Sequence, residues 1–491
     1  MKRISARRMQ PARGGMMAYG SGRRLAHAAL LCAALGAAAV PAGDVMMGPQ
    51  ADGSVLVPTG QRLTPVGKWL ITRNERPKDL AVSPDGSRLA VLTPRKVLIY
   101  SADIDTPVEI AGGGGPLGIA WRPDGGAVYH SAGRNVVCLP LANGRPGEAR
   151  RIPVDSDTVK MPGQPNDPQA AGIACAPDGS RLYVALGTRN VVAVLDPDGG
   201  APAQYVKVGV CPYHVKLSPD GGALWVSNRG GAAVGASRST AATAGTHVRI
   251  DRATDAAAGG TVSVIDTRTL VARHIPVGKQ PAGIAFSRDG ALAYVANSDS
   301  DTVSVVDARN YRMRFTLTLG RSGNDFGHMP TDVDVAEDGR TLYVACGGAN
   351  ALAVVRLGAD GLPDRRSEVG FVPTAWFPVA VRRTSSTLWV ACSKGIGSMG
   401  DLRQGGRWVH ASAGVVQKID SADLADLARL TERVASNNRW SGELPPRRNM
   451  PPVPVPERVG EPSVFRHVVY IIKENHTYDM TLGDMKEGNG D

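Results

Sequence analysis

The chain of 491 residues is 43% hydrophobic, enough for a folded core, and carries a formal net charge of +11. Seven basic residues precede the first acidic residue, Asp44, and without them 49 basic residues stand against 45 acidic ones. Because the body is nearly balanced and has no basic stripe interleaved with aromatic side chains, we expect no nucleic-acid partner.

The basic N-terminus is followed by an apolar run from Leu25 to Val40 and then by Pro41-Ala42-Gly43. This order is typical of an export signal that is cleaved after Ala42. Residues 1–42 are therefore predicted to be a signal peptide, and the mature chain to be periplasmic or secreted. The apolar run is somewhat short for a membrane span, so a retained anchor is the lesser alternative. Cys32 has no lipobox pattern ahead of it, and we do not expect lipidation.

A short repeat with Pro-Asp-Gly at its centre runs through residues 54–420. Four full copies and two looser ones are centred on Asp85, Asp124, Asp178, Asp220, Asp289 and Asp338. Proline presets the backbone at the first turn position, Asp caps the turn, and Gly adopts the positive φ that other residues resist. An apolar strand precedes each turn and a second follows it, as in Leu182-Tyr183-Val184-Ala185. Each copy therefore predicts a β-hairpin.

Two more strands accompany each hairpin. One follows it, as in Thr302-Val303-Ser304-Val305-Val306-Asp307, and another precedes it, as in Tyr205-Val206-Lys207-Val208. Four short strands per unit, with no helical period between units, are typical of a propeller blade. A seventh unit survives only as its strands, at residues 379–381 and 388–391. We therefore predict an all-β fold, a seven-bladed β-propeller over residues 54–420.

A closed ring needs its two ends joined, because an open edge strand invites aggregation. We predict that Lys68-Trp69-Leu70-Ile71-Thr72 supplies the outer strand of the seventh blade. The largest insertion, from Arg229 to Gly260, is rich in Gly, Ala, Ser and Thr and is predicted to loop out from the fourth blade without folding by itself. Since closure removes the edges of the ring, we expect a monomer.

The cysteines that remain after the signal are five in number and widely spaced: Cys138, Cys175, Cys211, Cys346 and Cys392. No Cys-x-x-Cys-His motif is present for covalent haem and no Cys-x-x-Cys pair for zinc. We predict that they are buried structural thiols, which behave as small hydrophobic residues.

The repeats resemble the YVTN family of seven-bladed propellers, whose name matches Tyr294-Val295-Ala296-Asn297 with one substitution. The resemblance covers roughly residues 68 to 420. It implies a fold but no activity, since propellers have many unrelated functions.

Past the ring, the hydrophobic period changes. Four residues fall on one face of a predicted amphipathic helix that leaves the ring with Ser421 as its N-cap: Leu424, Leu427, Leu430 and Val434. A proline-rich stretch from Pro445 to Pro456 then predicts a stiff extended connector. Residues 421–463 are thus interpreted as a helix and a linker between two folded units.

The run from His467 to Asp479 begins with continuous apolar residues, which favours a strand buried on both faces of a parallel sheet. Ligands bind beyond the carboxyl ends of such strands, where Glu474 and Asn475 would stand. A carboxylate and an amide oxygen are hard ligands that suit a divalent cation.

This run resembles the opening of the phosphoesterase domain of acid phosphatases and phospholipase C-like enzymes of the alkaline phosphatase superfamily. Those proteins carry a Lys-Glu-Asn-Arg-Thr-Tyr-Asp run, which residues 473–479 match except for His476 in place of Arg. The resemblance implies that Glu474 and Asn475 help to hold a catalytic divalent metal ion. Because the chain stops at Asp491, we expect residues 464–491 to be a truncated α/β phosphoesterase domain with no hydrolytic activity of its own.

Three functions stay open. The first is the exported propeller portion of a propeller-phosphoesterase whose full-length form hydrolyses phosphate esters with a divalent metal. The second is a non-enzymatic propeller, without a cofactor, that binds a protein, a cell-wall component or a small ligand. Its candidate residues are loop residues just before inner strands: Tyr213, His214, His328, Met329 and Pro330. The third, a redox propeller with haem or a quinone, is weakened by the missing haem motif.

Overall fold

The computed structural model describes residues 47–491, except for 102–103, 143, 155, 321–326, 365–367, 385–386, 398–411, 441–445, 448, 457, 459, 470, 472–480, 483 and 486–491. The chain divides into two compact units, and Gly48–Asp491 is the larger. The predicted signal peptide, residues 1–42, lies outside the described residues.

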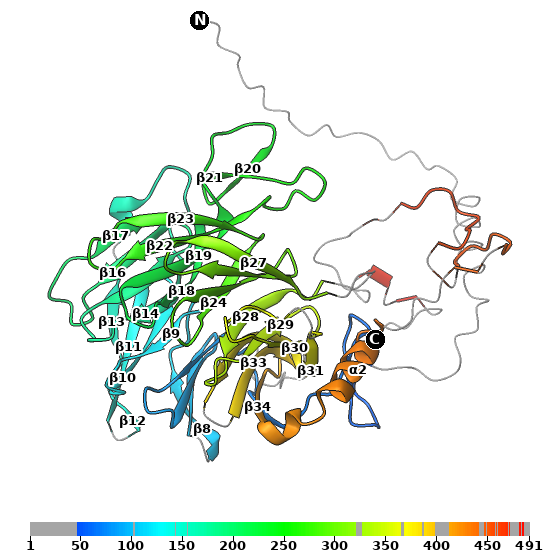
Figure 1. The fold of residues 1–491 in the computed structure, drawn as a ribbon, viewed down its shortest axis with the longest axis horizontal. Helices are drawn as coiled ribbons and strands as arrows, with labels where there is room; N and C mark the ends of the chain where they lie inside the picture. The colour runs from blue at the N-terminus through cyan, green and yellow to red at the C-terminus, as the bar shows by residue number, and fades with distance from the viewer. Residues whose placement is uncertain are drawn as a thin grey trace, which may run out of the picture. The chain divides into compact units, whose positions relative to one another are not determined.

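Within this unit the described residues form seven antiparallel sheets of four or five strands, numbered here in the order of their first strands (Figure 1). Sheet 1 contains β5 (Asp79–Val82), β6 (Arg88–Leu92), β7 (Lys96–Ser101) and β8 (Ile104–Ala111). Sheet 2 contains β9 (Ile119–Trp121), β10 (Ala127–Ala132), β11 (Asn135–Ala142), β12 (Arg145–Pro146) and β13 (Arg150–Pro153). Sheet 3 contains β14 (Ala170–Cys175), β15 (Leu182–Leu186), β16 (Val191–Leu195) and β17 (Gln204–Lys207). Sheet 4 contains β18 (Val210–Leu217), β19 (Ala223–Gly231), β22 (Gly260–Asp266) and β23 (Ala272–Val277).

The remaining three sheets follow the same plan. Sheet 5 contains β24 (Pro281–Phe286), β25 (Leu292–Asn297), β26 (Thr302–Asp307) and β27 (Arg312–Thr318). Sheet 6 contains β28 (Pro330–Val335), β29 (Thr341–Cys346), β30 (Ala351–Arg356) and β31 (Gly370–Pro373). Sheet 7 contains β32 (Trp376–Arg383), β33 (Thr387–Gly395), β34 (Val415–Asp420) and β4 (Lys68–Ile71).

The first strands of the sheets form a closed ring. Each contacts the first strand of the next sheet, in the order β5, β9, β14, β18, β24, β28 and β32, and β32 contacts β5 again. The ring is sealed by β4, which pairs with β34 in the register Val415↔Ile71 to Lys418↔Lys68. The prediction that this early strand completes the last sheet is therefore confirmed.

The Asp-Gly turns have the expected geometry. The glycine after each turn aspartate has a positive φ, for example +70° at Gly86 and +71° at Gly221. In the first copy the Ser83 hydroxyl donates to the Asp85 carboxylate, and this hydrogen bond helps to hold the pKa of Asp85 at about 2. Each tight turn sets the register of its hairpin, so that alternate side chains enter the core between neighbouring sheets.

The insertion in sheet 4 is more ordered than the sequence predicts. It contains a hairpin of β20 (Thr240–Thr243) and β21 (Thr246–Arg249), which extends beyond β22 and β23 in Figure 1. Val248 is buried against the ring, so this hairpin packs on sheet 4 instead of looping out into solvent. Polar contacts hold it as well, since the Asn190 amide donates to the Thr246 hydroxyl at 2.9 Å and Lys279 pairs with Asp251 at 3.1 Å.

The helix after the ring differs from the prediction in its start and in its direction. Ser421–Leu424 is the 3-10 helix η3, and the α-helix α2 spans Leu427–Asn437 with Asp426, not Ser421, as N-cap. The helix does not leave the ring, because it packs on β31, where the Phe371 amide donates to the Thr431 hydroxyl at 2.9 Å. Its apolar face finds a partner in sheet 6 and therefore stays with the ring.

A small N-terminal sheet of β1 (Gly48–Pro49), β2 (Val55–Leu56) and β3 (Arg62–Leu63) precedes the ring. The 3-10 helix η1 (Asp157–Val159) lies in the connection between β13 and β14.

The proline-rich stretch after the helix differs from the prediction. It is not an extended connector, because it turns back to form a bridge between Val453 and Ser463, held by the ion pair of Arg447 with Glu461. Val468 and Val469 of the apolar run after it are 86% and 83% exposed, and the strand that this run is expected to form in a complete α/β domain stays a prediction.

Candidate functional site

Long connections gather at one end of the ring, which we call the mouth. It is the end at which the first strand of each sheet begins and the second strand ends, as the pairs Val210↔Gly231 and Trp376↔Gly395 show. Strands β13, β19 and β33 end there, and β14, β22 and β34, which follow them after long connections, begin there. The opposite end carries the tight Asp-Gly turns. Because binding residues are commonly placed on loops above a rigid scaffold, the mouth is the candidate site.

Several inner strands have a left-handed backbone at their start, either at the residue just before the strand or at its second residue. The φ angle is +57° at Gln169, +53° at Cys211 and +50° at Gln280, and Met329 and Phe377 repeat this conformation in sheets 6 and 7. Residues other than glycine rarely adopt it, so the surrounding structure must hold these side chains in place. Four of the five stand directly before a proline, which begins or nearly begins the inner strand.

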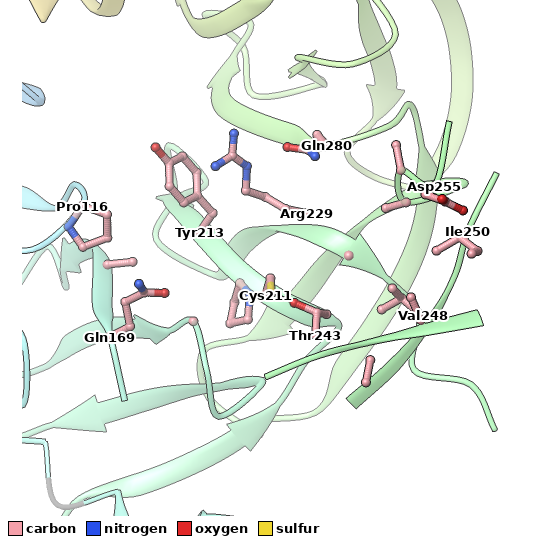
Figure 2. Close-up of a pocket in the computed structure, with 18 residues that line it drawn as sticks. Pro116, Gln169, Cys211, Tyr213, Arg229, Thr243, Val248, Ile250, Asp255 and Gln280 are labelled. Carbon is pink, nitrogen blue, oxygen red and sulfur yellow. Dashed lines mark hydrogen bonds between the residues drawn. The ribbon is translucent and has the colours of Figure 1, made fainter. Parts of the chain in front are cut away.

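A cavity of about 540 Å³ lies at the mouth between the ring and the β20–β21 hairpin (Figure 2). Its ring side is lined by Pro116, Gln169, Cys211, Tyr213, Arg229 and Gln280, and its insertion side by Thr243, Val248, Ile250 and Asp255, among others. Parts of sheets 3, 4 and 5 thus contribute to one concave surface. This volume is in the range of small-molecule binding sites.

Arg229 is the main cationic group of this cavity. Its guanidinium carbon lies 4.2 Å from the centre of the Tyr213 ring, and in the view of Figure 2 Arg229 stands between Tyr213 and Gln280. The Nε atom is buried without a hydrogen-bond partner among the described residues. A planar guanidinium stacked on an aromatic face keeps its outer N–H donors available for a planar anion.

A second cavity, of about 400 Å³, lies in the channel between the inner strands. Asp79, His214, Lys216, Asp334 and Arg382 line it. The Arg382 guanidinium, on β32, forms an ion pair with Asp332 on β28 and lies 3.6 Å from a carboxylate oxygen of Asp79 on β5. One side chain thereby connects the inner strands of sheets 1, 6 and 7.

Burial dominates the electrostatics of this channel. It raises the pKa of Asp79 and of Asp334, and the nearby positive charge of Arg382 opposes the increase. Burial by itself lowers the pKa of Arg382, but Asp332, Asp79 and Asp334 together raise it. Burial also lowers the pKa of Lys216 and brings that of His214 down to about 4. The charges of the channel thus neutralise one another in large part and form a structural network.

The comparisons with known proteins concern the fold. Residues 53–210, less than half of the chain, match the family described as the lipoprotein LpqB β-propeller domain, Gmad1. Hydrazine synthase of Kuenenia stuttgartiensis is similar in structure with a TM-score of 0.51 at 17% identity, over 70% of this chain and 96% of that chain. U3-55K has a TM-score of 0.50 at 11% identity, over 71% and 98% of the two chains.

The chain contains a β-propeller. Identities this low show a common architecture and no common activity. None of the curated proteins matches the chain.

The propeller places the predicted binding residues in three different surroundings. Tyr213 lines the mouth cavity and His214 the channel cavity, and both lie within β18, so their prediction as loop residues before the strand is wrong. His328 and Met329 do precede β28, which begins at Pro330. His328, however, is 1% exposed and packs against Phe371 and Trp440, with ring centres 5.4 and 4.8 Å away. It supports the docking of the segment after α2 instead of lining a cavity.

Sequence reasoning missed Gln169, Arg229, Gln280 and Arg382. A signal for two of them was present, since Gln280 precedes the inner-strand proline and Gln169 stands at the same place in its own repeat. Arg229 was taken only as the start of an insertion, and Arg382 carried no signal because its partners lie 50 and more residues away along the chain.

The predicted metal ligands Glu474 and Asn475 lie outside the described residues. Within the described part of the chain, no group of three or more His, Cys, Asp or Glu side chains is arranged to hold a metal ion. The five cysteines named above are free; Cys138, Cys346 and Cys392 are buried as predicted, but Cys175 and Cys211 are only partly buried. No helix among the described residues is both long and apolar enough to cross a membrane.

Proposed function

We propose that this chain is an exported seven-bladed β-propeller that binds a small ligand at its mouth. The seven sheets that follow one another around the ring support the number of blades. The observation that carries the binding function is the mouth cavity, whose walls come from several blades and from a dedicated insertion. An insertion that folds against the ring to complete a concave surface with a few polar groups fits recognition better than it fits stability alone.

The experiment is to block the cavity. Ala242 lines it and is exposed, so Ala242→Trp fills the space without disturbing the core of a blade. Ala236→Trp, at an exposed position of the same insertion that does not line the cavity, is the matched control. Thermal unfolding is followed with a panel of polyols, sugars, sugar acids and phosphate esters.

We expect at least one class of compound to raise the Tm of the wild type and of Ala236→Trp, because binding to the folded state alone stabilises it. The same compound should leave the Tm of Ala242→Trp unchanged. An equal response of all three proteins, or no response of the wild type to any compound, contradicts a binding site in this cavity.

A second candidate function rests on the motif of residues 473–479. We propose that the full-length form hydrolyses phosphate esters with a divalent metal, and that Glu474 and Asn475 help to hold this metal. Carboxylate and amide oxygens fit such an ion, which would polarise the phosphate ester and activate a nucleophile.

The test is a protein extended by the downstream coding sequence. It should hydrolyse p-nitrophenyl phosphate, lose this activity with EDTA and lose most of it in Glu474→Gln. Ala242→Trp serves as the control that should keep the activity. A downstream sequence without Asp and His ligands, or hydrolysis that persists in EDTA, contradicts this candidate.

We also propose a periplasmic or secreted location and a monomeric state. The N-terminal segment supports the location, and the match to a propeller of a lipoprotein family agrees with a place in the cell envelope. Cell fractionation and analytical ultracentrifugation check the two statements.

A further inference from the structure

Arg229 carries a charge that its surroundings do not neutralise. Among the described residues, no carboxylate oxygen forms an ion pair with its guanidinium, although ion pairs of this kind are present elsewhere in the ring. Asp255 lines the same cavity from the insertion side, where Figure 2 shows it apart from Arg229. A partly buried cation without a counter-charge is costly, and a bound anion would remove this cost.

The position of the guanidinium is fixed from two sides. Tyr213 supports its flat face, and β19, which ends just after Arg229 at Gly231, holds its backbone in the sheet. A rigid guanidinium loses little conformational entropy when it binds, and its two parallel N–H donors match the oxygens of a carboxylate or a phosphate.

Other groups in the cavity suit the uncharged part of a ligand. The side-chain amides of Gln169 and Gln280 line it from the neighbouring blades, and each can donate and accept hydrogen bonds. Val248 and Ala242 supply a short apolar wall on the insertion side. Both glutamines have left-handed backbones, so the start of each inner strand holds them at the mouth.

We infer that the mouth cavity binds a small hydroxylated organic anion, whose carboxylate or phosphate group pairs with Arg229 and whose hydroxyl groups contact Gln169 and Gln280. This inference rests on the proposed binding function and specifies the chemistry of its ligand. In this inference Arg229 binds the charged group of the ligand, and Tyr213 holds the guanidinium of Arg229 in position.

The test uses three probes with the same three-carbon skeleton: glycerol 3-phosphate, glycerate and glycerol. Titration calorimetry and thermal unfolding at low ionic strength compare the wild type with Arg229→Gln and Arg229→Lys. Arg249→Gln is the matched control, because Arg249 is an exposed arginine on β21 of the same insertion and does not line the cavity. The Tm without any probe shows that each variant is folded.

We expect the wild type and Arg249→Gln to bind at least one of the two anions in a saturable manner, and glycerol much more weakly. Arg229→Gln should bind the anion about tenfold or more weakly, which is the effect of losing one charge-assisted pair. Arg229→Lys should be intermediate, because it keeps the charge but not the planar donors. The stronger of the two anions identifies the group as a phosphate or a carboxylate.

The inference is overturned if Arg229→Gln binds the anions as well as the wild type does, or if neither anion binds. A neutral sugar that binds the wild type but not Ala242→Trp would then show that the cavity still binds a ligand and that only its charge was assigned wrongly. If Ala242→Trp weakens the binding of no probe, neutral or charged, the proposed binding function itself is wrong.

Discussion

The imidazole of His214 is 7% exposed in the channel, and its Nδ1 atom has no hydrogen-bond partner among the described residues. Burial lowers its pKa from 6.5 to about 4, while the charges of Asp332, Arg382 and Lys216 act on it in opposite directions. Between pH 6.5 and about 4, His214 is therefore neutral in the folded protein, whereas the same side chain is protonated in the unfolded chain. Its contribution to stability is present above pH 6.5 and is lost as the pH falls toward 4.

We predict that His214→Asn removes a part of the acid sensitivity of the fold. Between pH 7 and pH 5 the wild type should lose about 2 kcal/mol of unfolding free energy through this group, and the variant should lack this loss. Urea unfolding at several pH values measures the unfolding free energy of both proteins. Asp79 and Asp334, whose raised pKa values change stability with pH in the opposite direction, are present in both proteins, so their contributions largely cancel in the difference. Parallel stability curves for the two proteins, or an NMR titration of His214 near pH 6.5, contradict the prediction.

At the scale of elements, β4 is the strand that shows best how the two faces of a blade differ. Leu70 is 7% exposed and packs with the apolar residues of sheets 1 and 7, whereas its neighbour Ile71 is 48% exposed. Successive side chains of a strand point to opposite faces, so two adjacent positions sample the core and the solvent in the same element.

We predict that Leu70→Asp destabilises the protein by about 3 kcal/mol, because it puts a carboxylate without a partner into a packed core. The matched change on the other face, Ile71→Asp, should stay within about 0.5 kcal/mol of the wild type. Guanidinium unfolding monitored by tryptophan fluorescence compares the two variants. Equal and small effects would mean that β4 does not seal sheet 7 in solution.

For the whole ring, the seam between the first and the last sheets is the critical place. It is closed by main-chain pairing of β4 with β34 and by Arg382, which pairs with Asp332 and lies beside Asp79. The first set of contacts joins the outer strands and the second joins the inner ones. Both connect residues that are far apart along the chain, so they form only when the ring closes.

We predict that Arg382→Met costs about 3 to 5 kcal/mol of unfolding free energy, because it leaves buried carboxylates without their cation. Arg312→Met, at an exposed position of β27, is the control and should have little effect. Chemical unfolding at pH 7 measures both. Protonation of the carboxylates should reduce the loss at pH 5, because the pKa values of Asp79 and Asp334 are already raised by burial. A loss below about 1 kcal/mol would show that the main-chain seam is sufficient by itself.

Local sequence predicted most of the ring, because its signals are local. The turn glycines need a positive φ and the strands alternate in polarity, whereas the role of the strand at Lys68–Ile71 followed from the need to join the ends of the ring. Elements that depend on distant partners were predicted less well. Helix α2 was expected to leave the ring, but Thr431 and Val434 find partners on β31 that no local pattern shows.

The candidate site shows the same division. Tyr213 was identified from the sequence, but its neighbour Arg229 lies on another strand and was assigned to an insertion. The sequence by itself determined the repeat and its hairpins, since each follows from spacing over a few residues, and it indicated the strand that closes the ring, since a closed ring needs its two ends joined. The tertiary structure alone decided which charges are neutralised, because the folded ring brings Asp332 and Asp79 to Arg382 and brings the Tyr213 ring, but no paired carboxylate among the described residues, to Arg229.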